Sequence, residues 1–444
     1  MIPIVTPDEM AAIDAAAPEP VELLIDRAGA AVARSARRLL GGTYGRRVVV
    51  LAGPGNNGAD GRVAAGRLRR AGAVVEVVDP RAGVATLPNA DLVIDGAYGT
   101  GINRPWEPPA TEAPVLAVDI PSGISGLDGR LHGGALVADA TVSFAALKPG
   151  LLLGAGPAHV GRIDIPDIGL DVSSARAALV TAQDVGSWVP SRVADAHKWR
   201  SGVRVIAGSP GMTGAGTLVA AAAMRAGAGI VHATSPGAQG RWPTEVVGRA
   251  ASADGWATEV LEDHERFAAV VVGPGLGRDP SARAELDRLL AGCRRPVVVD
   301  ADGLALLDPD TVRARSVPTV LTPHDGEFAA LAGEPPEDDR IEAARSLAAD
   351  LGAVVLLKGP TTVVAEPGGF AQLSDQGDQR LATAGSGDVL SGVIGAYVAR
   401  GAEPAAAAAA AAFVHGRAAL ASPEEGTVAS DLLDRLGPAL GSCR

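Results

Sequence analysis

Short apolar runs recur along the chain, and segments with helical periodicity separate them. The runs are rich in valine, isoleucine and leucine and cover residues 47–52, 91–94, 115–118, 203–207, 270–272, 297–299, 319–321 and 353–357. Runs of this length and composition are typical of buried strands, and their alternation with helical segments is typical of parallel sheets. The pattern therefore predicts an α/β fold throughout the chain.

Two helices are predicted before the first of these strands. Thr6-Pro7-Asp8-Glu9 has the form of a capping box with proline at the first helical position, and the helical pattern continues to about Ala17. A second helix is predicted from about Val21 to Leu40. Both would lead into the first strand.

A glycine-rich turn follows the first strand. Residues Gly53 to Gly61 read GPGNNGADG, and a helix is expected to start near Arg62. The spacing matches G-x-G-x-x-G, and Asp79 follows the next strand at about the distance of a ribose-binding acid. A plain dinucleotide-binding Rossmann domain is therefore one interpretation. The two asparagines and the aspartate of the turn weaken it, because backbone amides alone normally serve such a turn.

Acids also follow the next two apolar runs. Asp95 opens DGAYGTG, and Asp119 opens DIPSG. Ligands of a doubly wound sheet bind at the carboxyl ends of its strands, so three polar strand ends indicate a site at one edge. Each acid by itself could instead cap a turn or the next helix.

The second half of the chain contains a longer series of such strand ends. A strand follows His197-Lys198, and the later segments are, in order, GSPGMTGAG, GPGLG, DADGL, TPHDGE and KGPTT. Taken alone, His324 could be a turn residue, Lys358 a solvated charge, and Asp300 with Asp302 a helix cap. Their order along one chain favours a shared site.

The stretch from Ala382 to Gly395 joins a glycine-rich turn to an apolar helix. The N–H groups of Gly385, Ser386 and Gly387 would lie at the helix N-terminus, where the helix dipole attracts an anion such as phosphate. Asp388 lies in the first turn. It either stabilises the helix electrostatically or acts as a catalytic base beside the phosphate.

Length and composition limit the possible functions. For 444 residues two or three domains are expected, and a change of pattern places a junction near residue 172. The formal net charge of −12 argues against binding along a nucleic-acid backbone, although small anions can bind locally. Cys293 and Cys443 are the two cysteines, so neither a disulfide framework nor a zinc site is expected.

The chain shows no signal for a membrane or for secretion. No apolar run is long enough for a bilayer span, and MIPIVTPDEM does not have the form of a signal peptide. We expect a cytoplasmic homo-oligomer that binds small molecules and has neither a nucleic-acid nor a membrane partner.

About the first 170 residues resemble the NAD(P)H-hydrate epimerase family. GNNGADG, DGAYGTGINRP and VDIPSG are similar to the signature segments of that family. The resemblance implies a Rossmann-like α/β/α domain, residues 1–172, that interconverts the R and S epimers of NADHX or NADPHX. These are damaged cofactors with a hydroxyl group at C6 of the nicotinamide ring.

This resemblance also implies site residues. Asp119 would transfer a proton, and K⁺ would be bound by Asn57, Asp95 and Ser122, whose oxygen atoms suit an alkali cation. The family usually has glycine at the position of Ala59, where a positive φ would cost an alanine about 1 kcal/mol. The substrate would contact Asn56, Asn57, Gly58, Ala59, Asp60, Gly99, Thr100, Gly101, Ile102, Asn103, Arg104, Pro105 and Asp119.

Residues 180 to 440 resemble ribokinase-like enzymes, and their motifs are similar to those of ADP-dependent NAD(P)HX dehydratases. The resemblance implies a ribokinase-like α/β/α domain, residues 173–444. In it, Asp388 would activate the C6 hydroxyl for phosphorylation by ADP, and loss of phosphate would restore NAD(P)H and leave AMP. One departure is Trp199, which stands where the family more often has glycine.

The same resemblance places two ligands. Glu327 would hold Mg²⁺ through water. The hydrate would contact Ala215, Gly277, His324 and Asp388, and the adenine nucleotide would contact Lys358, Gly359, Pro360, Thr361, Thr362 and Gly387.

Three classes of function follow from these observations. The leading one is a bifunctional enzyme that epimerises and then dehydrates the hydrated cofactor. The second is a ribokinase-like kinase for a vitamin-precursor alcohol with a nucleotide-sensing N-terminal domain. In the third, the first domain is a scaffold, since a similar fold occurs in an mRNA-decapping enhancer that binds RNA. The acidic composition and the presence of Asp95, Asp119 and Ser122 argue against the third class.

Overall fold

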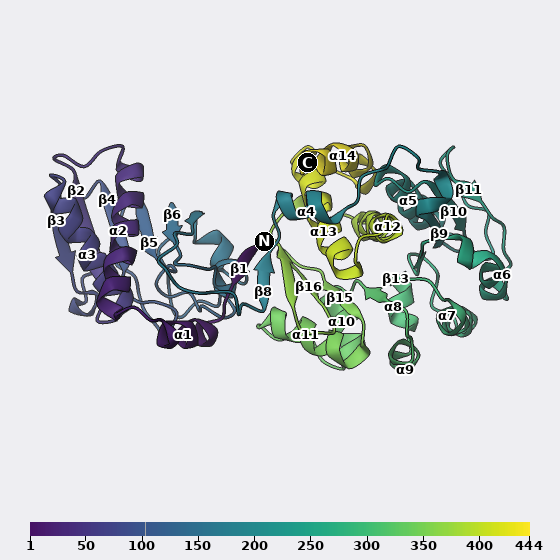
Figure 1. Ribbon diagram of the computed structural model, residues 1–444, viewed down its shortest axis with the longest axis horizontal. Helices are drawn as coiled ribbons and strands as arrows, with labels where there is room; N and C mark the ends of the chain where they lie inside the picture. The colour runs from purple at the N-terminus through teal and green to yellow at the C-terminus, as the bar shows by residue number, and fades with distance from the viewer. Residues whose placement is uncertain (103) are drawn as a thin grey trace. The chain divides into compact units, whose positions relative to one another are not determined.

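The chain forms two compact units. The computed structural model describes residues 1–102 and 104–444, and it divides into residues 2–177 and a second unit of residues 178–444 with Met1 (Figure 1). The expected junction at residue 172 lies a few residues before this division, which falls inside strand β8, Ala177–Leu179. The reason is that β8 belongs to the sheet of the second unit, where Val180 N donates to Leu373 O (2.9 Å).

The N-terminal unit is built on a parallel sheet with the strand order β3-β2-β4-β5-β6-β7. The predicted capping box is confirmed, because Thr6 Oγ1 accepts from Glu9 N and Glu9 Oε2 accepts from Thr6 N. The elements are β1 Ile2–Ile4, α1 Pro7–Ala16, α2 Val21–Leu40, β2 Arg47–Ala52, α3 Asn56–Arg70, β3 Val74–Val78, β4 Leu92–Gly96, β5 Val115–Val118, β6 Ala140–Val142 and β7 Arg162–Asp164.

Both faces of this sheet are covered. Helices α2 and α3 pack against each other on one face, over Val48 and Val50 of β2. On the other face, Ile102 and Trp106 from a connection between strands pack against Val49. Alternate residues of one strand thus enter two separate cores, as the two-residue period of a strand requires.

The start of α3 corrects a prediction. The helix begins at Asn56, with Gly55 as N-cap, and not near Arg62. A Cβ on Gly58 would lie 2.0 Å from Gly53 O, so this glycine lets the first turn of the helix pack on the preceding turn. Ala59 is helical and has no positive φ, so the backbone cost expected for it does not arise.

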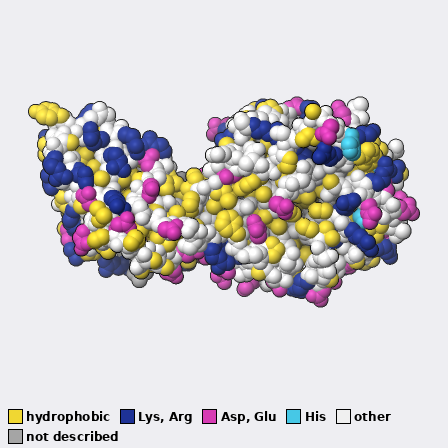
Figure 2. All heavy atoms as spheres, in the orientation of Figure 1, with side chains coloured by type: hydrophobic (Ala, Val, Ile, Leu, Met, Phe, Trp, Pro, Cys, Tyr) yellow, Lys and Arg dark blue, Asp and Glu magenta, His cyan; other side chains and the backbone are white. Residues whose placement is uncertain are grey.

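Arginines lie in the last turns of α2 and α3, among them Arg38 and Arg67. Cations at these places interact favourably with the free carbonyl groups of a helix C-terminus. Arg67 Nη2 also lies 2.7 Å from Asp26 Oδ2. Figure 2 shows many Lys and Arg side chains on the drawn face of the N-terminal unit. Several arginines of α2 and α3 thus lie at helix ends or in ion pairs.

The second unit contains a larger sheet with the order β8-β17-β16-β15-β14-β13-β12-β9-β10-β11. The strands from β15 to β11 in this order are parallel, and β16 is antiparallel to both β15 and β17. The segment KGPTT therefore connects two antiparallel strands. The strands are β9 Gly202–Ile206, β10 Ile230–Thr234, β11 Val247–Gly248, β12 Ala269–Val272, β13 Val297–Val299, β14 Thr319–Leu321, β15 Val354–Leu357, β16 Thr362–Ala365 and β17 Ala371–Ser374.

Helices lie on both sides of this sheet, with α5, α12, α13 and α14 on one side and α7 to α11 on the other (Figure 1). This is the predicted α/β/α arrangement. The helices are α4 Ala182–Trp188, α5 Thr213–Arg225, α6 Trp256–Asp263, α7 Pro280–Gly292, α8 Asp302–Leu306, α9 Pro309–Arg313, α10 Asp325–Ala332, α11 Arg340–Leu351, α12 Ser386–Ala399, α13 Pro404–Leu420 and α14 Ala429–Gly441.

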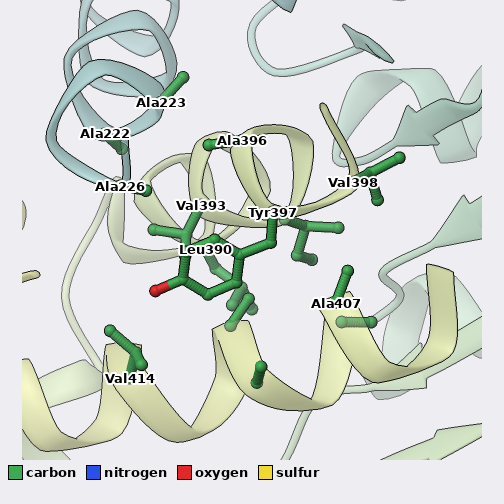
Figure 3. Close-up of a cluster of buried hydrophobic side chains, with 14 of the residues drawn as sticks. Ala222, Ala223, Ala226, Leu390, Val393, Ala396, Tyr397, Val398, Ala407 and Val414 are labelled. Carbon is green, nitrogen blue, oxygen red and sulfur yellow. The ribbon is translucent and has the colours of Figure 1, made fainter. Parts of the chain in front are cut away.

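Small side chains allow the helices of the second unit to pack closely. A Cβ on Gly392 of α12 would lie 2.3 Å from Val219 O of α5, so glycine is needed where these helices meet. Tyr397 extends from α12 among Leu390, Val393 and Val414 (Figure 3). Because α12 is buried along its length, its first turn, which contains Asp388, is held in place.

Within the residues that the structure describes, no helix is both long enough and apolar enough to cross a membrane.

Candidate active sites

A cleft of about 460 Å³ lies beside the start of α3 in the N-terminal unit. Its walls come from the turn after β2 and the segment after β4, which leave the sheet at the same edge because β2 and β4 are parallel neighbours. Of the predicted substrate contacts, it is lined by Asn56, Asn57, Gly58, Gly99, Thr100, Gly101, Ile102 and Arg104. Ala59, Asp60, Pro105 and Asp119 do not line it, and Asn103 is outside the described residues.

The three predicted potassium ligands lie around the ends of β4 and β5. Ser122 Oγ donates to Asp95 Oδ1 (2.6 Å), and Ser122 N donates to Asp95 Oδ2 (2.9 Å). Asn57 Nδ2 donates to Val118 O (2.6 Å). Asp95 is fully buried, and burial raises its pKa. Within the described part of the chain it has hydrogen-bond donors but no cationic partner, so its charge fits a bound cation.

Asp119 is paired with Lys148, a residue that the sequence analysis did not single out. Lys148 Nζ donates to Asp119 Oδ1, and both side chains are buried. The ammonium also lies 3.2 Å from Ser143 Oγ and 3.3 Å from Phe144 O. Asp119 has a φ of 67° and Ala145 a φ of 61°, which are unusual for residues other than glycine. Strained residues of this kind cluster at functional sites.

Asp60 has no ionic partner among the residues that the structure describes. Its side chain is buried on α3, and burial, followed by the charges of Asp119 and Asp14, raises its pKa to about 8. Asp14 lies on α1, and burial likewise raises its pKa, against the charge of Lys148. The N-terminal unit therefore contains four interacting titratable groups.

Asp79 does not offer a free carboxylate for a ribose. It caps the short 3₁₀ turn Pro80–Ala82 and pairs with Arg81 Nη2 (2.6 Å). Hydrogen bonds from Arg81 lower the pKa of Asp79 to about 2. The local pair therefore accounts for this acid, which weakens the plain Rossmann interpretation.

The predicted glycine turn before Asp388 leads into a helix, as expected, and forms the N-terminus of α12. Gly385 is the N-cap with a φ of 87°, which favours glycine, and Asp388 lies in the first turn. Burial, and after it the negative charge of Asp300, raise the pKa of Asp388 to about 7, against the charge of Lys358. A carboxyl that titrates near neutral pH suits a general base.

Asp300 connects this turn to Lys358. Lys358 Nζ lies 2.6 Å from Asp300 Oδ1, and Ser391 Oγ on α12 donates to Asp300 Oδ2 (2.5 Å). A Cβ on Gly387 would lie 3.5 Å from Lys358 Nζ, so the ammonium is beside the first turn of α12. The N–H groups of that turn and the lysine together form a place for an anion.

Two predicted substrate contacts, Gly277 and Ala215, lie on a loop after β12 and on the first turn of α5, which are close to each other. Asp302 accepts from Gly277 N (3.1 Å) and from Arg278 Nε (2.6 Å), which fixes the loop after β12. A Cβ on Gly275 of this loop would lie 3.0 Å from Ala215 Cβ, in the first turn of α5. Asp302, which from the sequence alone could have been a simple helix cap, therefore positions the loop that contains Gly277.

His324 and Glu327 cap α10. His324 Nδ1 accepts from Gly326 N (3.0 Å) and Glu327 N (3.2 Å), and Glu327 Oε2 accepts from His324 N (2.9 Å). Nδ1 therefore acts as a hydrogen-bond acceptor, and Nε2 lies 3.6 Å from Glu327 Oε1. The histidine side chain is 60% exposed, so it remains accessible while it serves as a cap.

The turn from Lys358 to Thr362 joins β15 to β16. Arg340 Nη2 donates to Lys358 O (2.7 Å) and to Asp325 Oδ1 (2.8 Å). A Cβ on Gly359 would lie 3.0 Å from Arg340 Nη2. Arg340, which the sequence analysis did not identify, therefore fixes the predicted nucleotide-binding turn.

Trp199 packs in an aromatic group. Its ring lies 5.7 Å from Phe267 and 5.4 Å from His232, and Arg266 stacks over it at 4.2 Å. Burial, together with Arg204 and Arg249, lowers the pKa of His232 to about 4. The tryptophan thus fills space at the start of β9, away from the α12 turn.

Comparison with known proteins identifies both units. A family model described as NAD(P)H-hydrate dehydratase matches residues 203–440, and one described as YjeF-related protein N-terminus matches residues 21–85 and 79–150. The bifunctional NAD(P)H-hydrate repair enzyme of Mycobacterium leprae is 42% identical, over 86% of this chain and 85% of the relative. The chain belongs to this family. The repair enzyme of Moorella thermoacetica is 36% identical, over 98% of this chain and 96% of the relative.

Solved structures resemble the second unit. The ADP/ATP-dependent NAD(P)H-hydrate dehydratase of Bacillus subtilis, co-crystallised with ATP and Mg²⁺, is 29% identical with a TM-score of 0.53, and the match covers 60% of this chain and 98% of that one. A ribokinase-like protein of Enterococcus faecalis is 21% identical with a TM-score of 0.54, over 60% of this chain and 96% of that one. The predicted ribokinase-like fold is confirmed.

Two residues of these sites, Lys148 and Ser391, were missed in the sequence analysis. Lys148 stands alone among apolar residues in AALKPG, and Ser391 stands alone in VLSGVIG. A single polar residue in an apolar segment needs a buried partner, and this signal could have identified both. The partners themselves, Asp119 and Asp300, are distant in the sequence.

Proposed function

We propose that this protein repairs hydrated nicotinamide cofactors in two steps. The N-terminal unit interconverts (R)- and (S)-NAD(P)HX, and the second unit dehydrates (S)-NAD(P)HX to NAD(P)H with ADP, which yields AMP and phosphate. The observation that carries the proposal is the group at the α12 turn, where Asp388 lies next to the Asp300–Lys358 pair. A base beside an anion site suits transfer of a phosphoryl group to a hydroxyl.

The dehydration follows from this group. Asp388 takes the proton of the C6 hydroxyl, whose oxygen attacks the terminal phosphorus of ADP, and AMP leaves. The phosphate ester then breaks at its C6–O bond and inorganic phosphate leaves with the electron pair of that bond, while C5 loses a proton to water and its C–H electron pair forms the C5=C6 double bond of NAD(P)H. Lys358 and the first N–H groups of α12 stabilise the charge on the phosphoryl oxygens. Ala215, Gly277 and His324 would position the hydrate.

The nucleotide would bind along the turn from Lys358 to Thr362 and at Gly387. Mg²⁺ would neutralise phosphate charge, and Glu327 would hold it through water. Among the described residues no group of three His, Cys, Asp or Glu side chains is arranged for a metal, which suits an ion bound mainly by phosphate oxygens.

A potassium ion would bind in the N-terminal unit to Asn57, Asp95 and Ser122. The fit rests on the buried carboxylate of Asp95, which has no cationic partner in the described ranges. Replacement of K⁺ by a large organic cation should slow epimerisation and leave dehydration of the S epimer unchanged. Equal rates in both salts would contradict a potassium site.

A product assay tests the function. With purified (S)-NADHX and ADP, NADH absorbance should return with equal amounts of AMP and phosphate, and without nucleotide it should not. With ATP and thiamine-precursor alcohols, no phosphorylated alcohol is expected. Phosphorylated alcohol without NADH formation would favour the kinase alternative.

The scaffold alternative would be favoured if the full chain consumed (R)-NADHX no faster than an Asp119→Asn variant. Cytoplasmic location and homo-oligomerisation stay predictions.

A further inference from the structure

Arg340 lies where two segments meet at the carboxyl edge of the larger sheet. Because β14 and β15 are parallel neighbours, the start of α10 after β14 and the turn after β15 leave the sheet at the same edge. Lys358 N donates to Pro323 O (2.9 Å), which joins the two segments through their backbones. Arg340 is the first residue of α11 and belongs to neither segment. One side chain from a third element can therefore act on both.

One nitrogen of the Arg340 guanidinium group binds both segments. Nη2 donates to Lys358 O (2.7 Å) and to Asp325 Oδ1 (2.8 Å). The arginine side chain is 17% exposed, so these bonds are largely shielded from water. Its Nε atom is buried and has no acceptor among the residues that the structure describes. A guanidinium group kept in such a place with an unpaired donor indicates a role beyond surface charge.

The guanidinium group also packs against the backbone of the turn after β15. A Cβ on Gly359 would lie 3.0 Å from Arg340 Nη2 and 3.3 Å from Thr361 O. The arginine thus forms one wall of this turn, and its removal would leave the turn without that support.

The two segments carry different proposed ligand contacts. Lys358 begins the turn proposed for the adenine nucleotide. Asp325 is the first residue of α10 and follows His324, which is proposed to position the hydrate, while Glu327 in the same helical turn is proposed to hold Mg²⁺. Because Arg340 binds the carbonyl group of Lys358, it acts on the backbone of the nucleotide turn and leaves the ammonium group free for its own contacts.

We infer that Arg340 is a positioning residue that links the nucleotide turn to the first turn of α10, so that Asp325 affects the affinity for ADP through Arg340. The inference rests on the proposed dehydration by the second unit. In the alternative, the ion pair only stabilises the connection between α10 and α11. Loss of the pair would then lower the free energy of unfolding and leave the Michaelis constants unchanged.

Arg340→Met tests the link from the side of the arginine. The KM for ADP should rise by about 10- to 100-fold, the effect of losing hydrogen bonds to a charged group. The kcat should fall much less, because the side chains of Asp388 and Lys358 remain. NADH absorbance with purified (S)-NADHX gives both constants, and titration with AMP measures nucleotide affinity without turnover.

Variants of Asp325 test the link from the side of α10. Asp325→Ala should raise the KM for ADP by about three- to tenfold, although this residue lies outside the nucleotide turn. Asp325→Asn keeps an oxygen that can accept from Arg340, so it should keep most of the wild-type affinity. The double variant Arg340→Met/Asp325→Ala should bind ADP no more weakly than Arg340→Met, because the same contact is lost only once. The Asp325 side chain is 60% exposed, so these variants decide the inference should Arg340→Met fail to fold.

Arg313→Met is the matched control. Arg313 Nη2 donates to Asp350 Oδ2 (2.7 Å) and its Nε donates to Asp350 O (3.3 Å), so it too binds a carboxylate and a carbonyl group. These contacts are at the last turn of α11, about 15 Å along the helix from Arg340. Arg313→Met should therefore have the KM for ADP of the wild type.

The possible failures are distinguishable. A wild type that forms no NADH from (S)-NADHX and ADP overturns the dehydratase function and the inference together. If the wild type forms NADH, a wild-type KM for ADP in folded Arg340→Met or in Asp325→Ala overturns the inference alone. An equal rise of this KM in Arg313→Met would also overturn it, since the effect would then come from a general loosening of α11.

Discussion

At the scale of single residues, each unit places a carboxyl next to a lysine and a second acid. Asp119 pairs with Lys148 near Asp60, and Lys358 pairs with Asp300 near Asp388. In both units the acid outside the ion pair has a raised pKa. In the second unit, this acid is the proposed base, Asp388.

Asp388→Asn is expected to abolish dehydration while nucleotide binding is kept, because the N–H groups of the turn remain and the base is lost. A loss of about 10²- to 10⁴-fold in kcat is expected. In the wild type, kcat/KM should rise with pH through about 7 as Asp388 ionises. The coupled assay for NADH formation and nucleotide titration measure both quantities. Near-normal turnover would mean that Asp388 only stabilises the start of the helix and is not the base.

Asp300→Asn should shift the same pH profile downward. The charge of Asp300 raises the pKa of Asp388, and its removal also frees Lys358 to stabilise ionised Asp388. The midpoint of the kcat/KM profile should therefore fall below that of the wild type. Thermal unfolding should show a loss of about 1–3 kcal/mol, since the hydrogen-bond partners of a buried carboxylate are left poorly paired. An unchanged midpoint in a folded variant would show that the two acids do not interact.

At the scale of elements, helix N-termini next to strand ends build both sites. α3 begins at Asn56 beside the end of β2, and α12 begins at Ser386 with its first turn beside Lys358. Glycines allow these contacts, since a Cβ on Gly53 would lie 1.8 Å from Ala97 O. Because α3 begins as early as Asn56, side chains of its first turn lie in the cleft of the N-terminal unit. A longer loop would have offered mainly backbone amides.

Ala59→Gly tests this account of α3. Since Ala59 is helical without a positive φ, glycine should lower the free energy of unfolding by about 0.5–1 kcal/mol and should not increase epimerisation. Ala12→Gly, on the exposed side of α1, is a control for the general cost of glycine in a helix. Denaturant unfolding and the epimerase assay provide the measurements. A stabilised or faster Ala59→Gly variant would mean that the backbone there is strained.

At the scale of the whole molecule, two compact units each contain a complete set of candidate residues. The N-terminal set lies within residues 2–177 and the second set within residues 178–444. The proposed reactions should therefore be separable by single substitutions.

Complementary variants test this separation. Asp119→Asn should lose epimerisation and keep dehydration of (S)-NADHX, and Asp388→Asn should do the reverse. A mixture of the two variants should then consume (R)-NADHX completely, because the S epimer can diffuse from one protein to the other. Rates are followed by NADH absorbance, with each variant alone as the control. Loss of both activities in either variant would contradict independent sites.

The sequence by itself determined the central strands of both sheets, several helices and the polar strand ends that were proposed as sites. Apolar runs, the capping box at Thr6 and the glycine turn before Asp388 are local patterns, and local patterns suffice for elements and for the polar ends of strands. The motifs also gave the family. The start of α3 was missed, because consecutive glycines and asparagines resemble a loop unless their packing against Ala97 is known.

Only the tertiary structure decided which groups act on one another. Lys148 and Asp119 are separated by 29 residues, and Lys358 and Asp300 by 58, so no local pattern joins them. The protonation of Asp60 and Asp388 depends on burial and on charges brought together by the fold, which raise the pKa of both acids. The positions of the acids follow from the sequence, and the folded environment determines the protonation state of Asp60 and Asp388.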